Sequence, residues 1–132
     1  MKVDERPHRD AYAAACLPAE IAQYGMARGY LEPGNCSTGT VLVLKQVKGM
    51  PGDHYVLQHG FLELNGRLYR IMSKDSLKRP LRIFYNQREG IINKNRYFLL
   101  SDFKDNSWDS RYWGEVGVQF LLKPVWLFED RW

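Results

Sequence analysis

A lysine at the end of an apolar run is the first residue of this chain whose setting could support chemistry. Lys45 directly follows the residues VLVL at positions 41–44. An edge-strand lysine that blocks aggregation would have the same setting. In the alternative, the lysine is held against an apolar wall, where desolvation disfavours its charged form and lowers its pKa. A neutral amine can accept a proton from a serine hydroxyl, so Lys45 is a candidate general base of a Ser-Lys hydrolase.

The segment DNSWDSRYWGEV, residues 105–116, offers groups that could aim such an amine. A hydroxyl both donates and accepts hydrogen bonds, so Ser107 can bond the amine in either protonation state. Asp109 and Arg111 can form a local ion pair that keeps the loop rigid. A turn stabilised by Asp and Ser side chains under the two aromatic rings would have the same composition, so the segment alone leaves both interpretations open.

The elements around these groups predict one mainly β domain. The 132 residues are 45% hydrophobic and 26% charged, which is ordinary for a folded domain. Strands are predicted at 11–17, 41–44, 54–57, 61–64, 67–72 and 96–100, with closing strands within 116–128. Asn65-Gly66 is a strong signal for a two-residue hairpin. Pro18 and the apolar stripe after it predict one helix that ends near Tyr30.

These elements favour a twisted antiparallel sheet or partly closed barrel with one short helix. Residues 1–10 are charged and predict a flexible arm, which leaves 11–132 as the folded domain. Residues 73–95 are polar and predict a long loop or irregular strands.

The middle of the chain is basic and suggests a different class of function. Residues 67–96 hold nine Lys or Arg and only two acids, Asp75 and Glu89. Such a stretch with interspersed aromatic rings is typical of domains that bind single-stranded nucleic acid. A solvated loop that faces anionic lipid headgroups has the same composition. The formal net charge of +4 is too small to identify a partner.

Two blocks of the sequence together resemble the signature blocks of the signal peptidase I family. KQVKGMPGD (45–53) is similar to the first block, and YFLLSDFKDNSWDSRYWGEV (97–116) is similar to the second, in the family's order. ACLP (15–18), ARGYL (27–31) and GNC (34–36) resemble the conjugative-transfer, or TraF-type, branch. That branch processes pilin precursors at the outer face of the bacterial inner membrane. The resemblance covers roughly residues 10–126 and implies a signal-peptidase-like fold.

The resemblance implies a role for each matching residue. Lys45 matches the general base, and Ser107 matches the hydroxyl that orients it. Asp109 and Arg111 match the pair that supports this loop. Three residues of the lysine strand would lie beside an extended substrate that binds by strand addition: Leu42, Val43 and Leu44. The chain departs from the family at Ser101-Asp102-Phe103, where relatives carry Ser-Asp-Asn or Gly-Asp-Asn.

The nucleophile is the larger departure. In the family the catalytic serine lies in a Ser-x-Pro motif upstream of the lysine, and this sequence contains no such motif. Ser37 lies eight positions before Lys45 and is followed by Thr38-Gly39, so it is a poor substitute. We therefore expect the nucleophile segment to be missing, through truncation, a misplaced start or natural loss, and the chain as given to be inactive. A natural loss would leave a relative that only docks pilin.

Cellular context and partners follow from the same resemblance. It places the domain at the periplasmic face of the inner membrane, where Cys16 and Cys36 are expected to form a disulfide. The cysteines and three histidines show no metal-ligand spacing, so no metal or cofactor is expected. The implied partners are a pilin-like precursor or signal-peptide substrate and, through a missing anchor, the membrane surface, with no obligatory nucleic acid. A basic β domain that binds single-stranded nucleic acid is the alternative.

Overall fold

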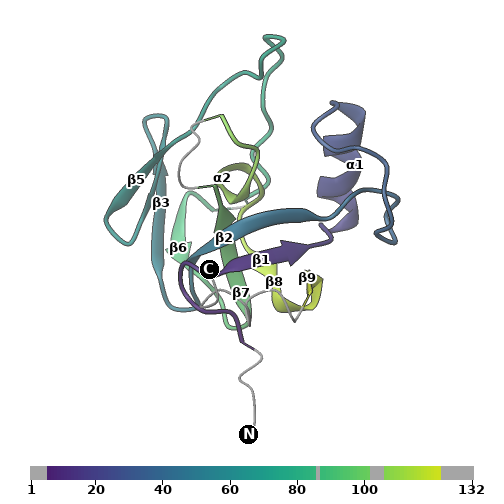
Figure 1. Cartoon of the computed structure of the whole chain (residues 1–132). Helices are drawn as coiled ribbons and strands as arrows, with labels where there is room; N and C mark the ends of the chain where they lie inside the picture. Colours follow the sequence, from purple (N-terminus) through teal and green to yellow (C-terminus); the bar gives the residue numbers. More distant parts are fainter. Residues whose placement is uncertain (1–5, 86, 102–105, 123–132) are drawn as a thin grey trace, which may run out of the picture.

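Two antiparallel sheets form most of the regular structure (Figure 1). The structure, a computed structural model, describes residues 6–85, 87–101 and 106–122. The larger sheet has the strand order β8-β7-β2-β1-β9, and the smaller sheet has the order β5-β4-β3-β6. The strands are β1 (Tyr12–Ala15), β2 (Val43–Gly49), β3 (His54–Gln58), β4 (Phe61–Leu64), β5 (Arg67–Arg70), β6 (Glu89–Ile91), β7 (Arg96–Leu100), β8 (Val116–Gly117) and β9 (Leu121–Leu122). The predicted mainly β, antiparallel fold is confirmed.

Three short helical elements connect the strands. Helix α1 (Ala19–Ala27) follows β1, helix α2 (Ser110–Trp113) follows β7, and the 3-10 turn η1 (Val118–Phe120) lies between β8 and β9. The predicted helix after Pro18 is confirmed, with Pro18 as its N-cap residue. Helix α2 has only four residues and therefore leaves no periodic signal in the sequence.

Strand β7 lies between the two hydrophobic cores of the domain. Successive side chains of a strand point to opposite faces, so β7 contributes to both. Tyr97 and Leu99 belong to the core that contains β1 and α1. Phe98 and Leu100 belong to the core of the smaller sheet. Because these four side chains are buried almost completely, β7 fixes the position of the smaller sheet against the larger one.

Strand β2 differs most from its prediction. The sequence predicts a strand over 41–44 that Lys45 interrupts, but β2 begins at Val43 and continues through Lys45 to Gly49. The predicted interruption is therefore wrong. The lysine is tolerated inside the strand because its amine has polar partners on the core side of the sheet. The hairpin at Asn65-Gly66 is confirmed, with β4 and β5 as its arms.

The predicted arm at 1–10 and the closing strands at 116–128 are described only in part. Residues 1–5 and 123–132 lie outside the described residues. Arg9 Nη1 donates to Asp53 Oδ2 at 2.9 Å, and the backbone of Asp10 bonds to strand β2. The part of the arm nearest the domain is thus attached to it. The described part of the closing segment contains β8 and β9.

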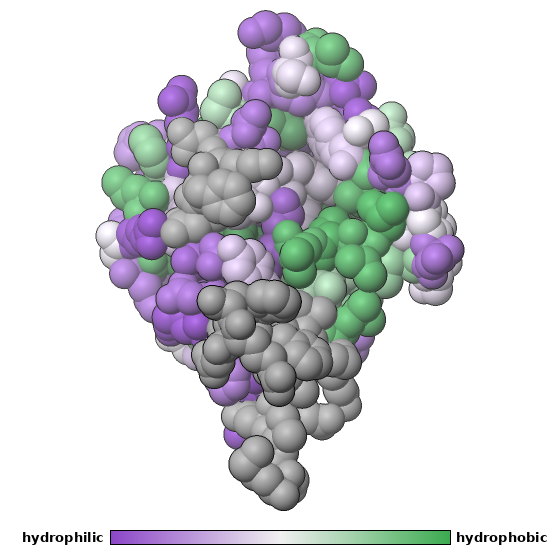
Figure 2. Space-filling view, in the orientation of Figure 1, coloured by the Kyte–Doolittle hydropathy of each residue, from purple (hydrophilic) through white to green (hydrophobic). Residues whose placement is uncertain are grey.

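One face of the larger sheet presents apolar side chains to the outside (Figure 2). Leu44 on β2, Ala14 on β1 and Leu122 on β9 lie side by side by strand register. Leu44 and Leu122 are 57% and 41% exposed, and Leu42 adds to the same area. We name this area the β1-β2-β9 face. Among the described residues, no helix has both the length and the apolar character needed to span a membrane.

The predicted disulfide is present between Cys16 and Cys36, whose Cα atoms are 5.6 Å apart. Cys16 follows β1, and Cys36 lies in the loop that leads from α1 to β2. The bond therefore joins the two ends of the segment that contains α1, close to the point where β2 begins beside β1.

Removal of this bond is expected to destabilise the domain. Cys16→Ser with Cys36→Ser frees a segment with a sequence separation of 20, which corresponds to about 3 kcal/mol of unfolding free energy. Urea unfolding of the natural and double-serine chains measures the difference. Dithiothreitol should destabilise the natural chain and leave the double-serine chain unchanged. Equal unfolding midpoints for the two chains would contradict the prediction.

Candidate functional site

Strand β2 points the Lys45 side chain toward the inside of the larger sheet. Val43, Lys45 and Val47 share one face of the strand because side chains alternate. Val47 is fully buried on that face. Ala13 lies directly across from Lys45 on β1 and carries only a methyl group, so it leaves room for the long lysine side chain. Lys45 is half-buried as a result.

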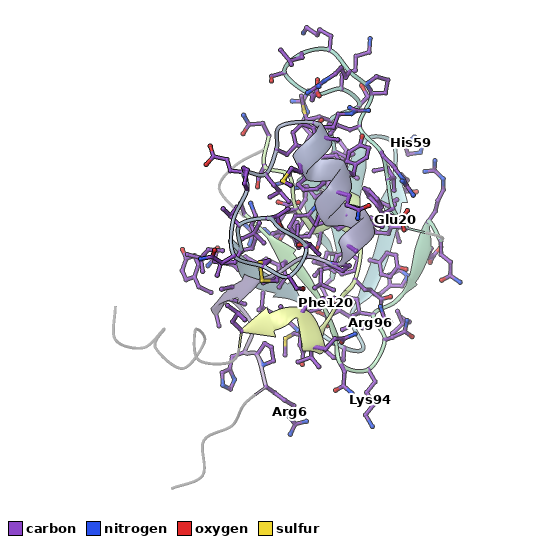
Figure 3. The ribbon with its side chains drawn as sticks, turned by 90° about the vertical axis from the view of Figure 1, so that its right-hand side faces the viewer. Arg6, Glu20, His59, Lys94, Arg96 and Phe120 are labelled. Atoms are coloured by element: carbon purple, nitrogen blue, oxygen red, sulfur yellow. A yellow bond between two sulfur atoms is a disulfide. The ribbon has the colours of Figure 1, made fainter. Side chains whose placement is uncertain are left out.

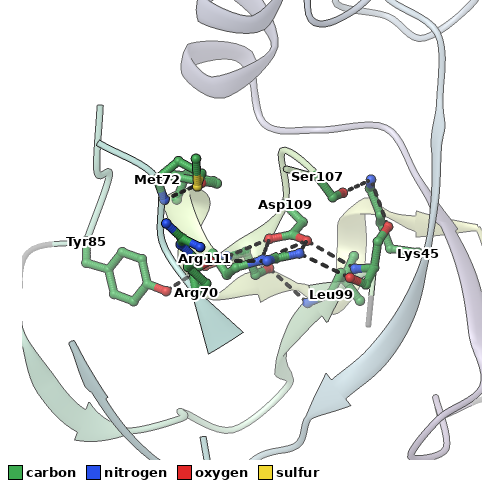
Figure 4. A network of polar contacts seen from close by, with 11 residues as sticks. Lys45, Arg70, Met72, Tyr85, Leu99, Ser107, Asp109 and Arg111 are labelled. Atoms are coloured by element: carbon green, nitrogen blue, oxygen red, sulfur yellow. Dashed lines mark hydrogen bonds and ion pairs between the residues drawn. The ribbon is translucent and has the colours of Figure 1, made fainter. Parts of the chain in front are cut away.

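The amine of Lys45 is held by two hydroxyl groups (Figure 4). Lys45 Nζ donates to Ser107 Oγ at 2.8 Å and to Ser101 Oγ at 3.2 Å. Ser107 is 8% exposed and precedes α2, whereas Ser101 follows the end of β7. The structure thus brings Lys45 and Ser107 together across 62 positions of sequence.

A buried ion pair supports the loop that carries Ser107. Asp109 and Arg111 are 0% and 1% exposed. Arg111 Nη2 donates to Asp109 Oδ2 at 2.9 Å, and Arg111 Nε donates to Asp109 Oδ1 at 3.0 Å. Asp109 also caps α2, because its side chain accepts from the backbone N–H of Arg111. One carboxylate therefore fixes both the helix start and the guanidinium.

The same pair is bonded to the strands on either side. The backbone N–H of Ser101 donates to Asp109 Oδ2 at 3.1 Å. Arg111 Nη2 donates to the Ser101 carbonyl at 3.1 Å, and Arg111 Nη1 donates to the Arg70 carbonyl at 3.2 Å. Both hydroxyls that hold the lysine amine are thus positioned by the Asp109–Arg111 pair.

Further hydrogen bonds hold helix α2 against strand β7 and against the segment that contains Tyr85. Ser110 Oγ accepts from the backbone N–H of Leu99 at 2.8 Å, and the Tyr85 hydroxyl donates to the Ser110 carbonyl at 2.6 Å. Burial, together with the nearby Asp109 charge, raises the pKa of Tyr85 well above its ordinary value. The phenol therefore stays protonated and remains a hydrogen-bond donor at neutral pH.

Three predicted substrate-binding residues lie on β2 or immediately before it, in different orientations. Val43 is half-buried on the Lys45 face, whereas Leu42 and Leu44 are exposed on the β1-β2-β9 face. The N–H and C=O of Val47 bond to the segment that enters β1, so by alternation those of Leu44 point toward the opposite edge of β2. The described pairing of β7 along that edge runs from Gly49 to Gln46. The backbone of Leu44 therefore faces the side of β2 from which Ser101 and Ser107 approach the amine.

Two residues of this site received no role from the sequence. Ser101 supplies the second hydroxyl at the amine, and its position at the end of a strong strand was the available signal. Tyr85 bonds to the loop from a segment that predicted only a loop or irregular strands. Because its contact joins residues 25 positions apart, local sequence carries no signal for it.

The basic residues of the middle segment lie in separate parts of the domain. The loop at 72–81 projects at the top of Figure 1, whereas Lys94 and Arg96 lie at the lower end of the molecule in Figure 3. Arg79 and Arg82 pair with Asp75 and Glu20. Within the part of the chain that the structure describes, no three His, Cys, Asp or Glu side chains are grouped as metal ligands would be.

Comparison with known proteins identifies relatives of this chain. The family described as signal peptidase, peptidase S26, matches residues 7–122. The plasmid transfer protein TraF of Escherichia coli is 28% identical over 125 residues, which cover 89% of this chain and 70% of TraF. Signal peptidase I of Buchnera aphidicola subsp. Schizaphis graminum is 35% identical over 78 residues, which cover 52% of this chain.

The extent of these matches differs among the relatives. The chain spans 25% of the length of the Buchnera enzyme. A crystal structure of a signal peptidase I from Enterococcus faecalis V583 is similar with a TM-score of 0.46 and 20% identity, and the match covers 89% of this chain and 95% of that one.

The buried ion pair generates a stability prediction. Asp109→Ala leaves the Arg111 guanidinium buried without its carboxylate, which is expected to lower the unfolding free energy by about 3–5 kcal/mol. Asp109→Leu combined with Arg111→Met removes both charges and is expected to cost less than Asp109→Ala alone. Urea unfolding of the natural chain and both variants tests this order. If the double variant is less stable than Asp109→Ala, the two side chains are not coupled as the geometry indicates.

Proposed function

The chain belongs to the signal peptidase family, peptidase S26, and from this premise we propose that it is the catalytic domain of a serine endopeptidase that uses Lys45 as its general base. The main support is the contact between Lys45 Nζ and Ser107 Oγ at 2.8 Å. An amine held between two hydroxyls and an apolar sheet face is suited to accept a proton from a third hydroxyl. The buried Asp109–Arg111 pair keeps this arrangement rigid before substrate binds, which is what efficient proton transfer requires.

In the proposed reaction a serine hydroxyl attacks the scissile carbonyl carbon while neutral Lys45 takes the hydroxyl proton. The protonated amine then delivers that proton to the departing peptide nitrogen, and the carbonyl remains bound to the serine as an ester. Water, deprotonated by the again neutral lysine, attacks the ester carbon. The protonated lysine then gives this proton to the departing serine oxygen, which releases the carboxyl product and regenerates the serine and the neutral amine. Ser101 and Ser107 hold the amine in position throughout by hydrogen bonds.

The attacking serine is proposed to be neither Ser101 nor Ser107. Both hydroxyls already orient the amine, and Ser107 is 8% exposed, so a peptide carbonyl has little access to it. The family's nucleophile lies in a Ser-x-Pro motif, and the 132 residues contain none. We therefore propose that the nucleophile is supplied by a serine outside these residues and that the chain alone does not cleave peptides.

The proposed substrate is a pilin-like precursor exported for conjugative transfer, cut after a small residue. The similarity to TraF over 89% of this chain supports the conjugative assignment. An extended peptide could bond to the backbone of Leu44, which faces the Lys45 site, by adding a strand along β2. The side chains of Leu42 and Leu44 point to the other face, so we assign binding there to main-chain contacts.

The proposed location is the periplasmic face of the bacterial inner membrane. The exposed β1-β2-β9 face supports a position next to lipid, because contact with a membrane surface removes such apolar side chains from water. The Cys16–Cys36 disulfide supports an oxidising compartment. Nucleic-acid binding is less well supported, since Lys94 and Arg96 (Figure 3) lie away from the 72–81 loop, and Arg79 and Arg82 are paired with acids.

Substitutions in the natural full-length protein test the proposed roles. Lys45→Met removes the base and is expected to lower the rate of precursor cleavage by about two to four orders of magnitude. Ser107→Ala removes one hydrogen bond to the amine and is expected to lower kcat roughly tenfold, with little change in KM. Lys94→Met, an exposed lysine at the far end of the domain, is the matched control. Undiminished cleavage by the Lys45→Met protein would rule out the proposed base.

The role of an outside nucleophile is tested with the 132-residue chain itself. Incubation with a peptide that carries the precursor's cleavage site is expected to give no product above the rate without protein. Product that disappears in the Lys45→Met chain would show that a serine within the chain attacks. Ser37→Ala would then determine whether Ser37 is that residue.

A further inference from the structure

A cavity of about 690 Å³ lies next to the lysine site and has no role in the proposed catalysis. Ser107 lines it, so whatever fills the cavity lies beside the hydroxyl that bonds the Lys45 amine. Its volume is within the range of sites that bind small molecules or peptide side chains. The walls combine apolar and aromatic side chains with two lysines and the carboxylate of Asp75. These walls include Met72, Lys74, Lys78, Leu81, Trp108 and Tyr112.

The loop at 72–81 forms one wall of the cavity and is held in place by Asp75. This carboxylate accepts from the backbone N–H groups of Leu77 and Arg79, each at 2.9 Å, and from the Tyr30 hydroxyl at 2.6 Å. The loop is also attached beyond α1, because Arg79 Nη2 donates to the Arg28 carbonyl at 2.9 Å. The wall therefore exists before any ligand binds, which reduces the entropy lost on binding.

Once the ion pairs of Asp75 are taken into account, the remaining charge at the cavity is positive. Burial alone would raise the pKa of Asp75, but hydrogen bonds from Tyr30 and Arg79 lower it well below its ordinary value, so the group is ionised at neutral pH. Its negative charge is matched by Arg79 at 2.8 Å and Arg28 at 3.7 Å. Lys74 and Lys78 are exposed at the rim, and in the described residues neither forms an ion pair with an acid.

The other walls are suited to aliphatic side chains. Trp108 and Tyr112 present rings, and Met72 and Leu81 present flexible apolar groups. Trp108 is held edge to face against Trp113 at 5.3 Å and tilted against Tyr30 at 5.2 Å, so its ring is fixed. A ligand that fits both kinds of wall carries a carboxylate next to an aliphatic group.

We propose that this cavity is a subsite for the peptide substrate and binds an acidic residue with an adjacent aliphatic side chain. The carboxylate pairs with Lys74 and Lys78, and the aliphatic group packs on Trp108. This inference rests on the proposed function, because it takes the ligand to be a peptide that also reaches Lys45. It adds a preference for an acidic residue near the cleavage site to the proposed cleavage after a small residue, while the main-chain contacts along β2 contribute affinity.

Binding to the chain as it exists tests the proposal without requiring cleavage. The probes are a capped six-residue peptide of alanine and leucine with one central aspartate and the same peptide with asparagine. Titration is followed by protein fluorescence, since Trp108 lines the cavity and the peptides contain no tryptophan. The aspartate peptide is expected to bind about fivefold more tightly, which is the scale of one or two exposed ion pairs.

Matched variants locate the binding. Lys74→Ala with Lys78→Ala is expected to remove the fivefold preference, whereas Lys94→Ala with Arg96→Ala, at the opposite end of the domain, is expected to keep it. Urea unfolding checks that both double variants remain folded. Equal binding of the two peptides, no binding of either, or a preference that survives loss of Lys74 and Lys78 would overturn the proposal. In a competition titration, a ten-residue deoxythymidine oligonucleotide is added to the complex with a labelled copy of the aspartate peptide. If it displaces the labelled peptide at a lower concentration than unlabelled aspartate peptide does, the cavity binds nucleic acid and the proposal is overturned.

The Lys45→Met chain separates this inference from the proposed function. It is expected to retain the full preference for the aspartate peptide, because Lys45 does not line the cavity. If the preference is present but cleavage by the natural protein does not depend on Lys45, the proposed function fails and the subsite remains. If cleavage depends on Lys45 but the preference is absent, the subsite alone fails.

Discussion

The site depends on a buried carboxylate and a buried guanidinium that belong to residues two positions apart in the chain. A buried charge without a partner is strongly destabilising, so Asp109 and Arg111 each need the other to remain inside the domain. Further hydrogen bonds of the pair to described residues go to Ser101 just after β7, to the start of α2 and to the end of β5. The pair therefore joins elements from both sheets at one point. The two hydroxyls that hold the lysine amine lie next to this point, and their geometry follows from it.

Strand β7 performs the corresponding function for the apolar part of the domain. Its alternating side chains fill one core with Tyr97 and Leu99 and the other with Phe98 and Leu100. The strand ends at Leu100, immediately before Ser101, so the close packing of the cores determines where Ser101 lies. The packing of β7 and the hydrogen bonds of the Asp109–Arg111 pair thus both position Ser101. This arrangement allows a lysine to be held inside a sheet face that would otherwise favour an apolar residue.

The cavity beside Ser107 extends this site outward. Its walls come from the loop at 72–81 and from the segment around Trp108, and it is bordered by Tyr30 just beyond α1. The Cys16–Cys36 bond joins the residue after β1 to the loop that follows Tyr30, so it limits how far α1 can move from the sheet. Positioning of the lysine and shaping of the cavity therefore share the Asp109–Arg111 pair, whereas the 72–81 wall depends in addition on the hydrogen bonds of Asp75.

The sequence by itself determined the mainly β class, the hairpin at Asn65-Gly66, the helix after Pro18 and, through two signature blocks, the family. The same blocks predicted Lys45, Ser107, Asp109 and Arg111 as the site. Each of these leaves a local signal in residue type or spacing. The tertiary structure alone decided that β2 runs through Lys45, that Ser101 is a second partner of the amine, and that Tyr85 and the 72–81 loop complete the surroundings. These features arise from contacts between residues far apart in the chain, such as the 56 positions between Lys45 and Ser101. The packing of β7, the Asp109–Arg111 pair and the hydrogen bonds of Asp75 together specify these contacts, and local sequence shows at most where a strand ends, not which distant residue it meets.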